Sequence, residues 1–343
     1  MSVDGGVRAM LGVCAVVLVV ALLYFARPIL APVAFALFLI ALVWPLQSRL
    51  QASMPKLLAL ALTLLATLVV LTALASLCVW GFGRAAEWLV ANAARFQSLY
   101  AQAADWLDGH GVYLGGFLED NLSSARLVAL VRDVSARLHG LVSFAVFTLV
   151  FLMLGLLEVD LARDKLASSG NDGLLTAVAG IAAKFRRFML VRTLVSVATG
   201  LVVWGFALLF GLELASAWGV IAFALNYIPF FGPLIATVFP TLFAIVQFES
   251  WQAALTVFLA LNVIQFLLGS YLEPRIAGAA LSLSPFLVLF SVFFWTFMWG
   301  LPGAFIGVPI MIAVHGLCTR TDGARWLAIL LSGKADSAEQ KTV

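Results

Sequence analysis

Four small or polar residues recur at helical spacing inside an otherwise apolar stretch. They are Asn262, Gln265, Gly269 and Glu273. Steps of three, four and four residues predict that they share one face of a helix. Polar groups are costly in hydrocarbon, so such a face is expected to line a bundle interior or a water-filled path. Pro274 and Arg275 follow, and two readings stay open: a functional carboxylate, or a structural Glu273–Arg275 ion pair at the membrane edge.

A second group of residues combines an amide, a phenol, prolines and a glycine in one short segment. Its members are Asn226, Tyr227, Pro229, Gly232 and Pro233. Irregular backbone is tolerated at membrane depth only where it is buried in protein or lines a wet cavity. The broken segment would free N–H and C=O groups for a polar solute, so it is the best candidate to line a solute path. The alternative is a simple turn at the membrane edge.

The composition requires a membrane for these residues. Of the 343 residues 64% are apolar and 11% are charged, against roughly 45–50% and 25% in soluble domains. A soluble cytoplasmic enzyme could not hide that much apolar surface. The apolar runs are continuous, whereas barrel strands alternate. The fold class predicted is therefore an all-α polytopic membrane protein, and a net charge of +3 gives no reason to expect a nucleic-acid partner.

About eight membrane-embedded helical segments are expected, from the ~20 apolar residues that a span needs. The ordinary spans are predicted at 7–26, 29–46, 57–82, 139–157, 188–210 and 251–272. Two longer regions, 214–248 and 284–318, are broken by proline and glycine and are expected to form re-entrant hairpins or pairs of short spans. Arg192 lies near the start of its predicted span and is expected to snorkel to the membrane edge.

The chain is expected to divide into four parts. Residues 1–83 form a three-span membrane unit, and 84–138 form an amphipathic helical hairpin outside the bilayer. Residues 139–319 form a transport core that contains both broken regions, and 320–343 form a cytoplasmic tail. With the N-terminus inside, the internal segments carry thirteen basic residues against six outside, so both termini are expected in the cytoplasm.

The two broken regions share a pattern. Pro233 and Pro240 are seven residues apart, as are Pro302 and Pro309, and each pair follows a cluster of aromatic residues and glycine. With one span between them, the regions would enter from opposite sides, like the inverted repeats of secondary transporters. Gly303 and Gly307 form a G-x-x-x-G pattern that predicts a close helix contact.

Motifs for catalysis are lacking. There is no G-x-x-x-x-G-K-[ST], H-E-x-x-H or G-x-S-x-G pattern. The three histidines are isolated, and the three cysteines are far apart. We therefore expect neither an enzyme nor a cofactor or metal site.

Several segments resemble the autoinducer-2 exporter family of bacterial permease-like membrane proteins. They are NYIPFFGP at 226–233, YLEPRIAG at 271–278, LSP at 283–285, and the run from Trp299 and Gly300 through Gly303 and Gly307 to Pro309. The resemblance implies an inner-membrane transporter that exports a quorum-sensing signal, and in some members sodium/proton antiport. It also implies a homo-oligomer, a pentamer. The path residues that it adds are Ser284, Pro285, Gly300, Gly303 and Pro309.

Three functions remain open on this basis. The first is a secondary transporter, or permease, that exports a small polar solute by alternating access, coupled to protons or sodium. The second is a monovalent cation (Na+/Li+)/proton antiporter with Glu273 as the titrating group. The third is a non-transporting membrane scaffold that assembles through 84–138.

Overall fold

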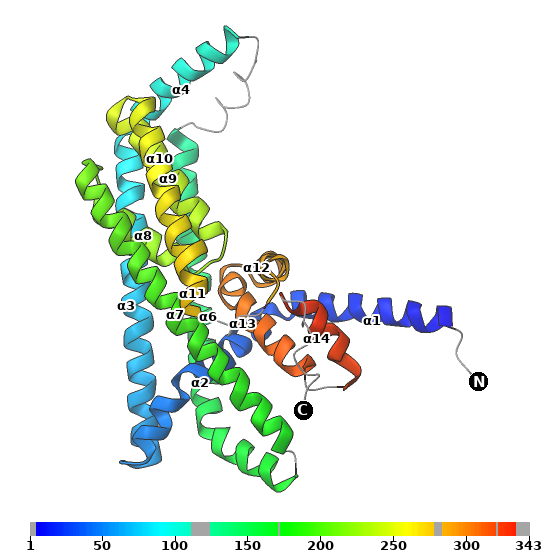
Figure 1. The fold of residues 1–343 in the computed structure, drawn as a ribbon. Coiled ribbons are helices and arrows are strands. Elements are labelled where there is room, and N and C mark those ends of the chain that lie inside the picture. The colour runs from blue at the N-terminus through cyan, green and yellow to red at the C-terminus, as the bar shows by residue number, and fades with distance from the viewer. Residues whose placement is uncertain (1–4, 111–123, 171, 278–282, 320–321, 334–343) are drawn as a thin grey trace. The chain divides into compact units, whose positions relative to one another are not determined.

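The structure is a computed structural model that describes residues 5–110, 124–170, 172–277, 283–319 and 322–333 (Figure 1). Its longer helices are α1 (Gly5–Phe25), α2 (Arg27–Gln51), α3 (Lys56–Ala91), α4 (Ala93–Asp108), α6 (Ser124–Ser168), α7 (Asp172–Phe210), α8 (Ala215–Leu225), α9 (Phe231–Phe248), α10 (Trp251–Gln265), α12 (Pro285–Trp299) and α13 (Leu301–Cys318). Shorter elements are the π-helix η1 (Phe266–Leu272), α11 (Glu273–Ala277), the 3-10 helix η3 (Asp322–Ala324) and α14 (Arg325–Leu331).

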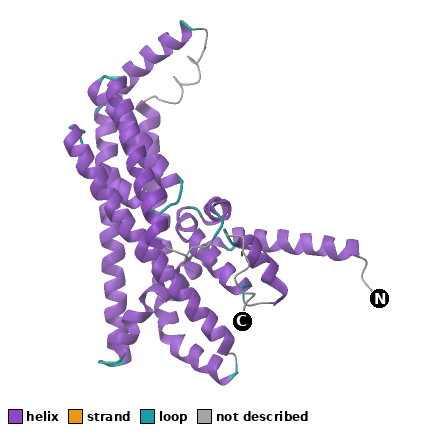
Figure 2. Ribbon diagram, viewed as in Figure 1, coloured by secondary structure: helices purple, strands orange, loops and turns teal. Residues whose placement is uncertain are grey.

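The fold class predicted from sequence is confirmed. Seven of the described helices are long and apolar enough to cross a membrane, and α8, α12 and most of α1 are shorter apolar helices. Within the described ranges, extended pairing is limited to one isolated bridge between Leu283 and Ser332 (Figure 2). The protein is therefore an all-α polytopic membrane protein.

Several helices run past the predicted span limits. α6 continues through both 138 and 157, and α7 starts at Asp172 instead of 188. Charged residues there do not end the helices, because they sit in good helix-forming sequence without proline or a glycine cap. Of the predicted hairpin at 84–138, α4 is present and α6 begins at Ser124, whereas 111–123 lie outside the described residues.

The described chain forms two compact units whose segments alternate along the sequence. Unit 1 comprises 1–66, 143–187 and 279–343, and unit 2 comprises 67–142 and 188–278. The first broken region belongs to unit 2 and the second to unit 1.

Unit 2 is organised around an aromatic core. The ring of Phe243 in α9 stacks on Trp88 of α3 at 4.4 Å between centroids and meets Trp218 of α8 edge-on at 4.7 Å. Both indole N–H groups donate to Glu213, one to its carboxylate and one to its carbonyl oxygen. These contacts hold α3, α8 and α9 together.

The first broken region is a hairpin whose two ends lie together. Gln247, in the last turn of α9, accepts from the Glu213 N–H at 2.9 Å and donates to the Gly211 carbonyl at 2.8 Å, just before α8. α8 has 11 residues, so it is about 16 Å long, half of the ~30 Å hydrocarbon core. In Figure 1, α9 and α10 run side by side. The region is therefore a helical hairpin with one short arm of 11 residues and one arm of 18 residues.

The second broken region, in unit 1, is a hairpin of the same kind. α12 has 15 residues and α13 has 18, the same length as α9. Gly300 turns the chain between them with a φ of 66° and a ψ of −143°, a conformation that is open mainly to glycine. Gly307 packs against the Ser291 backbone, and the Ser291 hydroxyl donates to the Gly307 carbonyl at 2.7 Å. The close contact predicted for the G-x-x-x-G pattern is present.

We predict that Gly303→Ala lowers the melting temperature of the detergent-solubilised protein. A β-carbon at Gly303 would overlap the carbonyl oxygen of Trp295, and such overpacking costs about 1–3 kcal/mol. Gly205→Ala in α7 is the matched control, because a β-carbon there meets open space and alanine is the better helix former. Equal melting temperatures for the two variants would contradict the tight hairpin.

Candidate functional site

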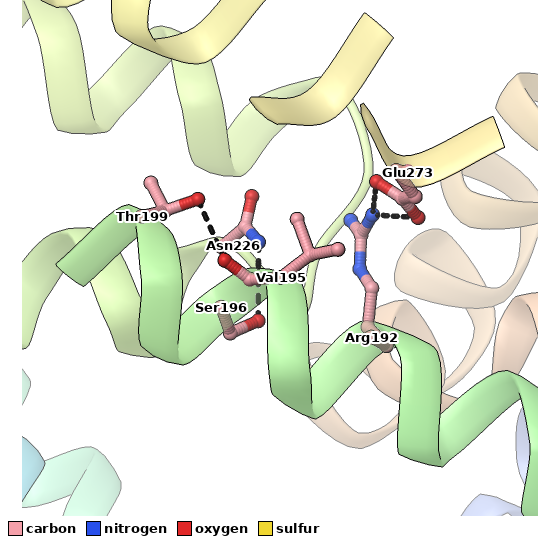
Figure 3. A network of polar contacts seen from close by, with 6 residues as sticks. All are labelled: Arg192, Val195, Ser196, Thr199, Asn226 and Glu273. Atoms are coloured by element: carbon pink, nitrogen blue, oxygen red, sulfur yellow. Dashed lines mark hydrogen bonds and ion pairs between the residues drawn. The ribbon is translucent and has the colours of Figure 1, made fainter. Parts of the chain in front are cut away.

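A layer of polar side chains lies in unit 2 beside the turn of the α8–α9 hairpin. Its members, called the polar layer below, are Arg192, Thr193 and Ser196 of α7, Asn226 and Tyr227 of the α8–α9 connection, and Glu273 of α11. Figure 3 shows Arg192, Ser196, Asn226 and Glu273 gathered along one stretch of α7. Three segments that are far apart in sequence therefore meet through polar contacts.

The strongest contact of the polar layer is an ion pair between Arg192 and Glu273. Their side chains are 7% and 17% exposed, so both charges are largely removed from solvent. Nη1 of Arg192 donates to Oε1 at 2.6 Å and to Oε2 at 2.7 Å. Removing one partner of such a pair leaves an uncompensated buried charge, at about 3–5 kcal/mol. The pair therefore fixes α11 to α7.

Two further hydrogen bonds tie the α8–α9 connection to the same helix. Nδ2 of Asn226 donates to the Ser196 hydroxyl at 3.1 Å, and both side chains are buried. The Tyr227 hydroxyl donates to the Thr193 hydroxyl oxygen at 3.0 Å. The amide and the phenol predicted to line a path thus face α7.

The tip of the hairpin is tightly wound. The Phe231 N–H donates to the Pro229 carbonyl at 2.8 Å, and Phe230 between them has a φ of 65° and a ψ of −52°. This is a γ-turn of the rare, positive-φ kind, and such a conformation costs about 1–3 kcal/mol. A β-carbon at Gly232 would overlap the carbonyl oxygen of Leu225, so glycine is required there.

A π-helix precedes Glu273. Pro274 has no N–H, and its ring would clash with the carbonyl one turn earlier in a regular α-helix. The wider turn of residues Phe266–Leu272, with Gly269 inside it, accommodates the proline. It also changes the direction in which Glu273 leaves the helix, because the residues no longer follow α-helical spacing.

Arg275 is not the partner of Glu273. Its guanidinium lies 4.0 Å from the centroid of the Tyr271 ring, in a cation–π contact. The structural alternative considered from sequence named the wrong arginine, because the carboxylate pairs with Arg192 of another helix. The expectation that Arg192 snorkels is also wrong, since its side chain is buried near the middle of α7.

The face predicted from the Asn262–Glu273 spacing is only partly present. Gln265 is 8% exposed and Glu273 belongs to the polar layer, but Asn262 is exposed and its amide donates to the Phe258 carbonyl one turn earlier. The buried residues of α10 are Ala254, Val257, Leu261 and Gln265. Asn262 is separated from the others because it lies off this face.

The predicted prolines and glycines of the path occupy helix starts, turns and helix interiors. In unit 2, the Pro233 carbonyl near the start of α9 accepts from the Thr237 hydroxyl, and Pro240 is buried inside α9. In unit 1, Ser284 precedes α12 and Pro285 is its first residue, while Pro309 is buried inside α13. The predicted residues from Asn226 to Arg275 lie in unit 2, and those from Ser284 to Pro309 lie in unit 1.

The α7 side of the polar layer was missed from sequence. Arg192, Ser196 and Thr199 are spaced by four and three residues, which is the same signal that singled out the stretch at 262–273. All three are buried, and Thr199 donates to the Val195 carbonyl at 2.8 Å. This spacing was visible in the sequence. Because the span was predicted to begin at 188, however, Arg192 was assigned to a helix end and not to a buried face.

Comparison with known proteins places the chain among transporters. The sequence signature described as "AI-2E family transporter" matches residues 13–321. The chain is 27% identical to "AI-2 transport protein TqsA" of Escherichia coli (strain K12) over 318 residues, which cover 90% of each chain. It is 30% identical to a "Putative transport protein" of Borreliella burgdorferi over 55% of this chain and 53% of the relative. It is 28% identical to "Putative transport protein YhhT" of Escherichia coli (strain K12) over 61% and 60%.

We predict that Glu273→Gln sharply lowers the melting temperature, by an amount that corresponds to about 3–5 kcal/mol, because Arg192 loses its counter-charge. The double change Glu273→Gln with Arg192→Gln should recover most of the loss, since no buried charge is then unpaired. Arg275→Gln is the control, because this exposed side chain makes only a cation–π contact and its loss should cost no more than about 1 kcal/mol. Equal losses in Glu273→Gln and Arg275→Gln would disprove the assigned pairing.

We also predict that Phe230→Gly is more stable than Phe230→Ala by about 1 kcal/mol, because glycine adopts a positive φ without steric cost. Phe239, about equally exposed but inside α9, supplies the control: there alanine should be favoured over glycine. Thermal unfolding of the four variants measures both differences. The same order at both positions would show that Phe230 is not strained.

Proposed function

The chain belongs to the AI-2E family of transporters, and from this premise we propose that it is a secondary transporter that exports a small polar solute by alternating access. Such a protein would draw on gradients, in keeping with a sequence that has no phosphate-binding loop. It would change access by moving broken membrane helices about a central site. We assign that site to the polar layer of unit 2.

The observation that carries the proposal is the position of the polar layer at a helix break. Polar groups and irregular backbone are each costly in hydrocarbon and are retained where they serve a path or a binding site. Here they coincide: Asn226 and Tyr227 belong to the turn of the hairpin, and Glu273 follows the π-helix. A membrane scaffold would need neither feature.

The cargo that we propose is a signal of the autoinducer-2 kind. The relative with the longest match of those above is named for transport of AI-2. The polar layer contains one cation and one anion, so its formal charge is zero, and its other groups are amide, phenol and hydroxyl. Such groups suit an uncharged, oxygen-rich solute.

We further propose that the protein works in the inner membrane as a homo-oligomer, with both termini in the cytoplasm. The excess of thirteen basic residues over six on the segments assigned to the inside supports this orientation. Antiport of sodium and protons through Glu273 is the less favoured alternative, because that carboxylate is already engaged by Arg192.

We predict that proteoliposomes of the purified protein move AI-2 down a gradient without ATP, and that Asn226→Leu lowers the initial rate at least about tenfold. Asn262→Leu is the matched control: it is the same substitution in the same unit, but at an exposed site outside the polar layer, and its rate should stay within about twofold. Maleimide labelling of a cysteine placed at Ser337 reports which way the protein faces.

Three results would contradict the proposal. Wild-type vesicles that move no AI-2 would reject the cargo. Equal rates for the two leucine variants would remove the polar layer from the path. Sodium-driven proton movement without AI-2 flux would favour the antiporter.

A further inference from the structure

The Arg192–Glu273 pair uses a single nitrogen atom of the guanidinium. Both carboxylate oxygens bond to Nη1, at 2.6 and 2.7 Å. A guanidinium presents five N–H donors in a fixed fork, and its best-fitting carboxylate contact engages two nitrogens in parallel. The edge that carries Nε is left out of the pair.

That edge is buried without a protein acceptor. Among the described residues, no group accepts a hydrogen bond from Arg192 Nε. Buried donors are nearly always bonded, because otherwise they lose water and gain nothing. In the described part of unit 2, the buried side-chain atoms that lack a partner are this nitrogen and Oε1 of Gln265. The nitrogen belongs to the polar layer itself, and Gln265 ends α10 just before the π-helix that leads to Glu273.

Arg192 lies on the face of α7 that meets the hairpin turn. Ser196, one turn further along, accepts from Asn226, and Thr193 accepts from Tyr227. Figure 3 shows Arg192 and Asn226 on the same side of α7, with Val195 between them. A solute held beside the hairpin turn therefore lies along the face to which this arginine belongs.

We propose that Arg192 is a solute-binding residue whose Nε edge donates to an oxygen atom of the cargo, and that Glu273 is a positioning residue that holds the guanidinium by Nη1. The proposal rests on the transport function proposed above, and it identifies the side chain that binds the solute. It also names the group that is read, a hydroxyl or carbonyl oxygen. The carboxylate makes no contact with the cargo in this arrangement.

Arg192→Lys separates this role from a structural one. An ammonium can bond both oxygens of Glu273 through its one nitrogen, as Nη1 does now, but it has no second edge. We expect the melting temperature to be nearly unchanged and the KM for AI-2 to rise at least about tenfold, with Vmax within about twofold. An unchanged KM in Arg192→Lys would overturn the proposal.

Arg186→Lys is the matched control. Arg186 also uses a single Nη1 contact, to the Ala41 carbonyl at 2.9 Å, but it lies in unit 1, outside the polar layer. Its replacement should leave KM unchanged. A rise in KM equal to that of Arg192→Lys would show a general effect of losing a guanidinium, and would overturn the specific role.

A second measurement does not depend on the cargo. In a variant whose Cys14, Cys78 and Cys318 are alanine, Arg192→Cys with Glu273→Gln places a thiol on the proposed path without leaving an unpaired charge. A hydrophilic methanethiosulfonate should label this thiol. Val203→Cys, in the apolar core of the same helix, should stay unlabelled.

The two proposals fail in different ways. If wild-type vesicles move no AI-2 but the thiol at 192 is labelled, the proposed cargo is wrong and the path at Arg192 stands. If that thiol reacts no faster than the one at 203, solute does not reach Arg192 and the inference is overturned, whatever the flux.

Discussion

A charge that is buried midway along a membrane helix must be neutralised where it stands, and Arg192 imposes this constraint on unit 2. Its helix cannot move it to solvent, because its side chain lies inside the unit. The counter-charge must therefore lie within the unit beside Arg192, and Glu273 supplies it. This requirement explains the position of α11. It also explains why an irregular helical turn, the π-helix, comes directly before Glu273.

The π-helix and Pro274 are understandable in these terms. In a continuous α-helix from Trp251, Glu273 would lie about 80° around the axis from Gln265, with a helix-breaking proline immediately after it. The wide turn at Phe266–Leu272 absorbs the proline and redirects the carboxylate toward α7. The irregular backbone that looks like a defect in the helix is what lets two distant charges meet.

The α8–α9 hairpin turn satisfies its backbone N–H groups in a similar way, within the protein. Three backbone N–H groups at the break bond to nearby carbonyl oxygens: those of Ile228 to Leu225, of Phe231 to Pro229, and of Gly232 to Ile228. Glycine at 232 is what allows the returning chain to pass the Leu225 carbonyl so closely. The side chains of Asn226 and Tyr227, freed from serving the local backbone, bond to α7. Buried N–H groups without an acceptor are costly, so the turn is held in one strained shape.

Sequence patterns were sufficient for the membrane class, for both broken regions and for the two glycines at their closest contacts. These features depend on local sequence: apolar runs, proline pairs and glycine spacing. The partner of Glu273 could not be predicted in this way, because the nearest basic residue in sequence is Arg275 and the true partner is 81 positions away. The predicted face at 262–273 failed at Asn262 because the buried face of α10 runs through Leu261 and Gln265, and Asn262 lies to one side of it. The π-helix at Phe266–Leu272 then ends regular α-helical spacing before Glu273.

The two hairpins share a plan but differ in chemistry, and this difference supports the assignment of the candidate site. Both hairpins join a short helix to a helix of 18 residues. In each longer helix, an interior proline follows another proline near the helix start by seven positions. At the turn of α8–α9 the side chains include an amide and a phenol that reach a third helix. At the turn of α12–α13 the corresponding side chain is the indole of Trp299, which donates to the Leu23 carbonyl of α1 at 3.1 Å, and the buried Ser291 hydroxyl donates to Gly307 within the hairpin. The shared plan supplies a tight turn of membrane backbone in each case. A solute needs exchangeable polar partners as well, and the described residues supply these at the first hairpin.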